Sequence, residues 1–63
     1  MKPMELCEYL NTLTEEQIRY LCDNLNDIYD SDIYSDRESI QKHCLVDWEV
    51  RYYILCALNR YTG

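Results

Sequence analysis

The sequence has very few of the residues that reverse a chain tightly. It contains one glycine, Gly63, and one proline, Pro3, among 63 residues. Strand-rich folds need such residues at the tight turn of nearly every reversal, so this composition disfavours a β-sheet. A chain of this length also forms one small core. We therefore expect an all-α fold, a single domain over residues 1–63 with three to four short helices.

A long apolar run is also missing. No stretch approaches the roughly 18 residues of a membrane span, and Glu5 and Glu8 interrupt the apolar residues near the N-terminus, unlike a signal peptide. These features predict a cytoplasmic protein, in its producing cell or in an infected host cell. In that compartment the four cysteines are expected to stay reduced and to fill core positions.

The sequence lacks the spacings typical of metal and catalytic sites. The cysteines form no C-x-x-C pair of a structural zinc site, and the acidic segment NDIYDSDIYSDRE, residues 26–38, does not fit an EF-hand loop. His43 and Cys44 would point about 100° apart on a helix, and one small core leaves no room for a substrate cleft. We expect no enzyme activity, no cofactor and no metal site. One alternative is a metal-binding protein that uses Cys7, Cys22, Cys44, Cys56 and His43.

Basic residues are scarce. Six lysines and arginines stand against twelve aspartates and glutamates, which gives a formal charge of −6. Proteins that bind nucleic acid neutralise its phosphates with lysine and arginine, and an anionic membrane surface repels a chain of this charge. We therefore expect a protein partner, without direct contact to nucleic acid or to a membrane.

Helix-start signals divide the chain into segments. The capping-box pattern Thr14-x-x-Gln17 opens a second helix, and the pattern Ser35-x-x-Glu38 opens a third. Asp47 can cap a fourth helix, because its carboxylate can accept a hydrogen bond from a free backbone N–H. The predicted helices span approximately residues 3–11, 15–29, 36–45 and 48–61.

The second predicted helix has two different faces. Steps of three and four residues place one apolar set toward the core: Ile18, Leu21, Cys22, Leu25 and Ile28. The same steps on the opposite side collect Glu16, Tyr20, Asp23, Asp27 and Asp30. Like charges at these spacings repel, and a face that only confers solubility more often mixes both signs. This stripe is a candidate binding surface, although a solvated helix face is the simpler interpretation.

The last predicted helix is apolar on two sides and is predicted to end near Thr62 and Gly63. One apolar face consists of Val50, Ile54, Ala57, Leu58 and Tyr61, and the other of Trp48, Tyr52 and Leu55. A helix that is apolar nearly all round needs neighbours on both sides, and three short helices can hardly wrap it. Tryptophan and tyrosine are enriched at interfaces. We therefore expect the second face to contact a partner or a second copy of the chain.

Together these features predict a small acidic interaction module, an inhibitor or adaptor that binds another protein such as a nucleic-acid-binding enzyme. Carboxylates along a helix can imitate the charges of a nucleic-acid backbone. Small acidic phage proteins that block restriction or CRISPR nucleases share this composition, but the analogy does not extend to the sequence. The alternative is a structural or regulatory homodimer without charge imitation. The predicted acidic surface consists of Glu16, Tyr20, Asp23, Asp27, Asp30, Asp32, Tyr34 and Asp36, and the predicted apolar surface of Trp48, Tyr52 and Leu55.

Overall fold

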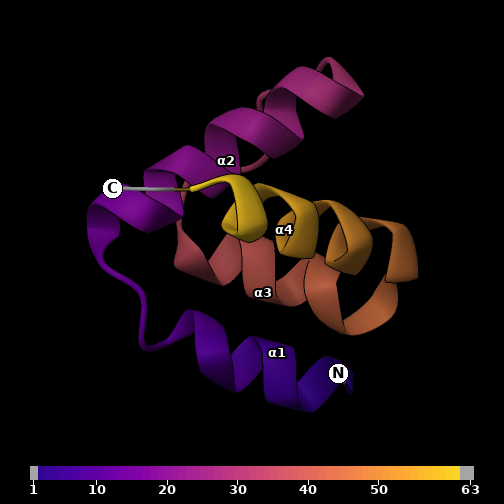
Figure 1. The fold of residues 1–63 in the computed structure, drawn as a ribbon. Helices are drawn as coiled ribbons and strands as arrows, with labels where there is room; N and C mark the ends of the chain where they lie inside the picture. The colour runs from indigo at the N-terminus through magenta and orange to yellow at the C-terminus, as the bar shows by residue number, and fades with distance from the viewer. Residues whose placement is uncertain (1, 62–63) are drawn as a thin grey trace.

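Four helices make up the computed structural model, which describes residues 2–61 (Figure 1). They are α1, Pro3–Leu10; α2, Glu15–Tyr29; α3, Arg37–Val46; and α4, Trp48–Arg60. No strand occurs among the described residues, which confirms the all-helical fold expected from the composition. Thr62 and Gly63, near which the last helix was expected to end, lie outside the described residues.

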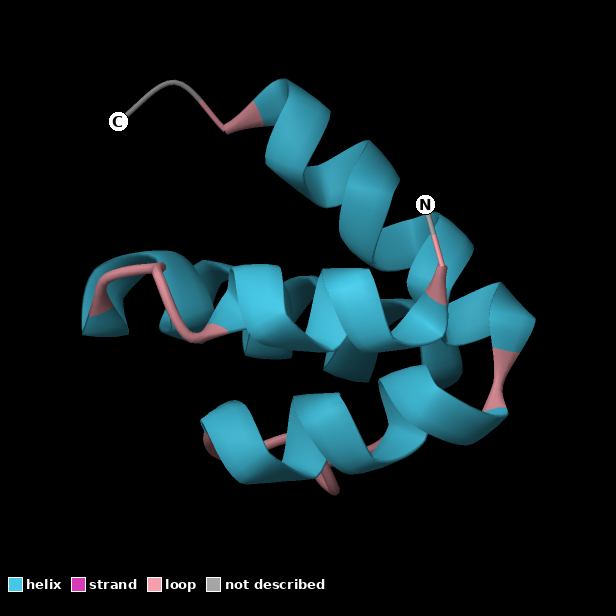
Figure 2. Cartoon of the chain, turned by 90° about the horizontal axis from the view of Figure 1, so that it is seen from below, coloured by secondary structure: helices cyan, strands magenta, loops and turns pink. Residues whose placement is uncertain are grey.

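Two of the main packing contacts join helices that are not consecutive in the sequence, and the third joins neighbours. α1 lies against α3, α2 against α4, and α3 against α4. The connecting loops are short, as a view from below shows (Figure 2). Within residues 2–61, no helix has both the length and the apolar character needed to cross a membrane.

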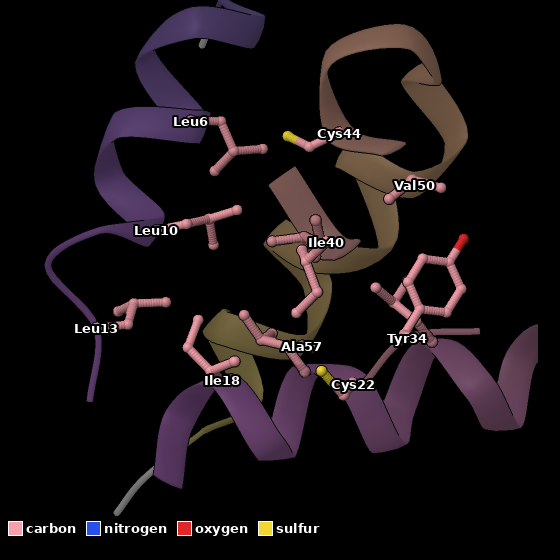
Figure 3. Close-up of a cluster of buried hydrophobic side chains, with 13 residues drawn as sticks. Leu6, Leu10, Leu13, Ile18, Cys22, Tyr34, Ile40, Cys44, Val50 and Ala57 are labelled. Atoms are coloured by element: carbon pink, nitrogen blue, oxygen red, sulfur yellow. The ribbon is translucent and has the colours of Figure 1, made fainter. Parts of the chain in front are cut away.

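All four helices contribute side chains to one hydrophobic core (Figure 3). Its buried residues are Leu6, Leu10, Leu13, Ile18, Leu21, Cys22, Leu25, Tyr34, Ile40, Cys44, Val50, Ile54 and Ala57. The core face predicted for α2 is confirmed except at Ile28, which is 41% exposed. Tyr29 packs against the core in its place, and its hydroxyl donates a hydrogen bond to Glu49 at 3.1 Å. The last turn of α2 therefore presents the ring of Tyr29 to the core and leaves Ile28 partly exposed.

Side-chain caps fix where α2 and α3 begin. The Thr14 hydroxyl accepts a hydrogen bond from the Gln17 N–H at 3.1 Å, and the Gln17 side chain accepts one from the Thr14 N–H at 2.9 Å, as predicted. The pattern predicted for α3 is wrong by one residue, because Asp36 and not Ser35 is the N-cap. The Asp36 carboxylate accepts from the Ser39 N–H at 2.8 Å, and the Ser39 hydroxyl accepts from the Asp36 N–H at 3.2 Å. A charged carboxylate also interacts favourably with the positive end of the helix dipole.

A single residue, Asp47, separates α3 from α4. Its carboxylate accepts from the Glu49 N–H at 3.0 Å, which confirms its predicted role as a cap. Its own N–H donates to the His43 carbonyl at 2.9 Å, and the Arg51 guanidinium donates to the Cys44 carbonyl at 2.7 Å. These bonds satisfy carbonyl groups that the end of α3 would otherwise leave free. They fix the orientation of α4 relative to α3.

Candidate partner-binding surfaces

The carboxylates of α2 and of the loop that follows it form an exposed surface. Glu16, Asp23 and Asp27 share one face of α2, Asp30 is its C-cap, and Asp32 lies two positions further along the loop. All five side chains are exposed. We call these five residues the acidic surface. The structure therefore leaves most of the predicted carboxylates accessible to a partner.

Tyr34, which was predicted to lie among these carboxylates, is instead part of the core. It is 4% exposed, so the interpretation of its side chain as a surface contact is corrected. Its ring centroid lies 6.2 Å from that of Tyr29 and 5.0 Å from that of His43. The loop folds back onto the helices because the core gains this aromatic ring. Burial raises the pKa of the Tyr34 hydroxyl, and the carboxylate of Asp47 raises it further.

Two other predicted members of the surface have structural roles. Tyr20 is half-buried, and its ring centroid lies 5.0 Å from that of Tyr61 at the end of α4. Asp36 is exposed, but its carboxylate caps α3. Tyr20 therefore joins two helices, and Asp36 presents a charge that is already engaged by a helix terminus.

The loop that carries Asp30 and Asp32 is held by Asn26, a residue that the sequence patterns did not single out. The Asn26 amide donates to the Tyr34 carbonyl at 2.8 Å and accepts from the Tyr34 N–H at 3.0 Å. Asp30 ends α2 in the left-handed conformation with φ 50°, which aspartate tolerates better than most residues. The end of α2 and the two hydrogen bonds between Asn26 and Tyr34 therefore fix the backbone of residues 30–34. The signal for Asn26 was weak: a residue of low helix propensity inside a predicted helix.

Three of the four arginines bond to groups outside the acidic surface, and the fourth, Arg19, lies one helical turn from Glu16 and Asp23 without forming an ion pair to either. Arg37 donates to the carbonyls of Leu10 at 3.0 Å and Leu13 at 2.6 Å, and it pairs with Glu15 at 2.9 Å. This is the one ion pair among residues 2–61. Arg60 donates to the side-chain amide oxygen of Asn24 at 3.2 Å, and Arg51 donates to the Cys44 carbonyl near the end of α3. Half of the basic residues are thus engaged in structural bonds, and no carboxylate of the acidic surface has an ion-pair partner in the described part of the chain.

A second surface lies on α4. Trp48, Tyr52 and Leu55 are 69%, 56% and 41% exposed, and we call these three residues the α4 apolar face. The opposite side of the helix is buried through Val50, Ile54 and Ala57. The two-faced character predicted for this helix is therefore present, with one face in the core and one in solvent. The helices that pack against α4 are α2 and α3, and within residues 2–61 the second face stays uncovered.

Two open hollows border residues 34–36. One of about 310 Å³ lies between α2 and this segment and includes Cys22; another of about 400 Å³ lies along the start of α3 and includes His43. The expectation that the chain has no room for a cleft of this size is wrong.

Burial raises the pKa of the Cys22 thiol, as do the carboxylates of Asp23 and Asp36, so this thiol stays protonated near neutral pH. His43 uses Nδ1 to donate to a backbone carbonyl at 2.8 Å, that of Ser39.

The cysteines are separate thiols. Cys22 and Cys44 are buried, and Cys7 and Cys56 are half-buried. Burial raises the pKa of Cys44 to about 11, and the neighbouring Cys7 contributes to the rise. Within residues 2–61, no three histidine, cysteine, aspartate or glutamate side chains are placed together to hold a metal ion. The proposed Cys/His metal site therefore has no ready-made ligand cluster in this part of the chain.

Comparison of the chain with protein-family models, with curated proteins and with solved structures gives no match. The features of the chain that bear on its function are therefore the two surfaces, one acidic and one apolar.

Proposed function

We propose that the protein is a non-catalytic interaction module whose acidic surface binds a basic surface of a partner protein, in place of the nucleic acid that such a partner binds. The observation that supports this most directly is the lack of ion-pair partners at the acidic surface within residues 2–61. Arg37, the basic residue that does form an ion pair, pairs with Glu15, outside this surface. The negative charge is thus left available to a partner.

The spacing of the carboxylates supports an imitation of phosphates. At 1.5 Å of rise per residue, Asp23, Asp27 and Asp30 follow one another at about 6 and 4.5 Å along α2. One strand of DNA carries a charge about every 3.4 Å of helix axis, so this line has a lower but comparable charge density. A groove lined with lysine and arginine for phosphates gains the same kind of attraction from such a line.

The rigidity of the acidic surface also supports binding. The capping box at Thr14 fixes the start of α2, and Asn26 clamps the loop after its end. Binding orders few groups when the groups are already held, so less of the interaction free energy is spent on ordering. The five carboxylates are presented by a scaffold that needs no partner to position them.

The test is capture of partners from a lysate of the native host by the tagged protein, at low salt and at about 0.5 M, where the Debye length is roughly 4 Å. We expect nucleic-acid-processing proteins to be retained at low salt, released at high salt and displaced by duplex DNA of unrelated sequence. The triple variant Asp23→Asn, Asp27→Asn, Asp30→Asn should lose this capture, because it removes three charges from the line without changing side-chain size.

The matched control is Glu5→Gln, Glu8→Gln, Glu38→Gln, which removes three exposed carboxylates from α1 and α3. It changes the net charge equally and leaves the acidic surface intact. Retained capture by the control and lost capture by the α2 variant would support the proposal. Equal capture by both variants would show that the acidic surface only confers solubility.

A further inference from the structure

We infer that the α4 apolar face binds a second copy of the chain, forming a symmetric dimer that leaves both acidic surfaces free. The inference is independent of the proposed function, because it rests on different residues. Trp48 and Tyr52 are more than half exposed, although aromatic side chains of this size usually dominate cores and interfaces. A face of this kind on one helix, with the opposite side buried, indicates a missing neighbour.

The distribution of charge makes the α4 side the place where two copies can meet. Residues 1–36 hold nine of the twelve carboxylate side chains and two of the six basic side chains. Residues 37–60 hold the other three carboxylates and the other four basic side chains. The first part repels another copy of itself, and the second is close to neutral. Association through α4 therefore avoids the like-charge contact that association through α1 or α2 would create.

The exposed area agrees with a small symmetric interface. Trp and Tyr side chains cover about 150–250 Å² each, so Trp48 and Tyr52 leave roughly 250 Å² exposed. Leu55, which is 41% exposed, adds roughly 50 Å². Two copies would bury roughly 600 Å² of apolar surface. At the 65% apolar fraction of homodimer interfaces, this corresponds to roughly 900 Å² in total, which lies in the range of weak, reversible contacts.

The face is also preorganised. The Tyr52 ring contacts the Tyr53 ring edge-on at 5.4 Å between centroids, and Tyr53 contacts Tyr29 at 5.8 Å. This row of rings connects the exposed Tyr52 to side chains packed on the core. Little side-chain freedom is lost when such a residue is buried by a second copy, so even a small interface can bind. We expect a reversible dimer in the micromolar range or weaker, because the area is small.

The experiment is sedimentation equilibrium of the purified protein from about 1 to 500 µM, with the fluorescence of Trp48, the only tryptophan, as a second readout. The mass should rise with concentration from 7.7 kDa toward twice that value. The emission of Trp48 should shift to shorter wavelength over the same range as the indole leaves water. A mass that stays at that of one chain over the whole range would overturn the inference.

Variants locate the interface. The triple variant Trp48→Ala, Tyr52→Ala, Leu55→Ala should weaken association at least tenfold, while its helical circular dichroism stays unchanged because these side chains are exposed. The single variant Tyr52→Glu, which places two charges in a symmetric contact, should do the same and serves if the triple variant fails to fold. The control is Met4→Ala, Tyr9→Ala, which removes the two exposed apolar side chains of α1 and should leave association unchanged.

A dimer that persists in Tyr52→Glu and in the triple variant would place the interface elsewhere and overturn the inference. The variant Asp23→Asn, Asp27→Asn, Asp30→Asn should dimerise like the unmodified chain. Loss of partner capture in that variant and loss of self-association in Tyr52→Glu are therefore separate results, and either can fail without the other.

Discussion

Individual side chains in the last turns of α2 and in the loop after it set the limits of the acidic surface. Asn26 holds Tyr34 through both of its backbone groups, and Tyr34 in turn fills the core. Periodicity could not predict this, because residues 30–34 belong to no helix and have no repeating face. The same limit explains Ile28: a helical repeat assigns it to the core, but the tertiary packing places Tyr29 there. The exposed aspartates were easier to predict, since charged residues seldom become buried.

Removal of the Asn26 amide should loosen the loop. We expect Asn26→Ala to lower the free energy of unfolding by about 2 kcal/mol, because the N–H and carbonyl of Tyr34 each lose a partner. Urea denaturation at micromolar protein concentration measures this. Asn59→Ala, at an exposed position of α4, is the control and should change the value by less than about 0.5 kcal/mol. Similar small changes in both variants would mean that the clamp contributes little to stability.

At the scale of helices, boundaries were the most predictable feature, because caps and helical periodicity are local. The start of α3 shows where local patterns become ambiguous. Ser35-x-x-Glu38 and Asp36-x-x-Ser39 are offset by one residue, and both match a capping arrangement. Packing decides between them, since it is Tyr34 that enters the core and thereby fixes the backbone just before Asp36. A single sequence does not contain that information in any short pattern.

Two serines on either side of this start distinguish the alternatives. We expect Ser39→Ala to destabilise the protein by about 1 kcal/mol, because the Ser39 hydroxyl accepts hydrogen bonds from the N–H groups of Ser35 and Asp36. Ser35→Ala should change the free energy of unfolding by less than about 0.5 kcal/mol, since the Ser35 hydroxyl does not cap α3. Thermal and urea unfolding of the two variants side by side is the measurement. The reverse order would restore Ser35 as the cap.

For the molecule as a whole, the sequence predicted which residues of the two surfaces are exposed better than it predicted the long-range bonds around them. The outward face of α4 follows from the spacing of its apolar residues alone. The roles of the arginines do not, because Arg37 reaches carbonyls of Leu10 and Leu13 more than twenty positions earlier in the chain. Such long-range bonds decide which carboxylates remain unpaired. The strength of the charge at the acidic surface is thus a property of the tertiary structure, although its position is a property of α2.

The buried thiols and tyrosines make the stability of the whole protein depend on pH. Burial raises the pKa of Cys44 from its ordinary value of 9.0 to about 11, and burial is also the largest cause of the raised pKa values of Cys22, Tyr29 and Tyr34. A raised pKa means that the folded state holds the proton more tightly than the unfolded state does. The stabilisation is therefore complete below the unfolded-state pKa and is lost as the pH rises through the folded-state pKa.

We expect the free energy of unfolding to be steady as the pH rises toward 9 and to fall above it. For Cys44 alone, a rise of two units at 1.36 kcal/mol per unit corresponds to a loss of about 2 to 3 kcal/mol between pH 9 and 11. Urea denaturation in steps across this range gives the slope directly. Cys44→Ala removes the titrating group, so its slope should be shallower than that of the unmodified chain even though its stability at pH 7 is lower. Equal slopes in the two proteins would show that the buried thiol does not couple folding to pH, and that the alkaline loss comes from the tyrosines or from the overall negative charge.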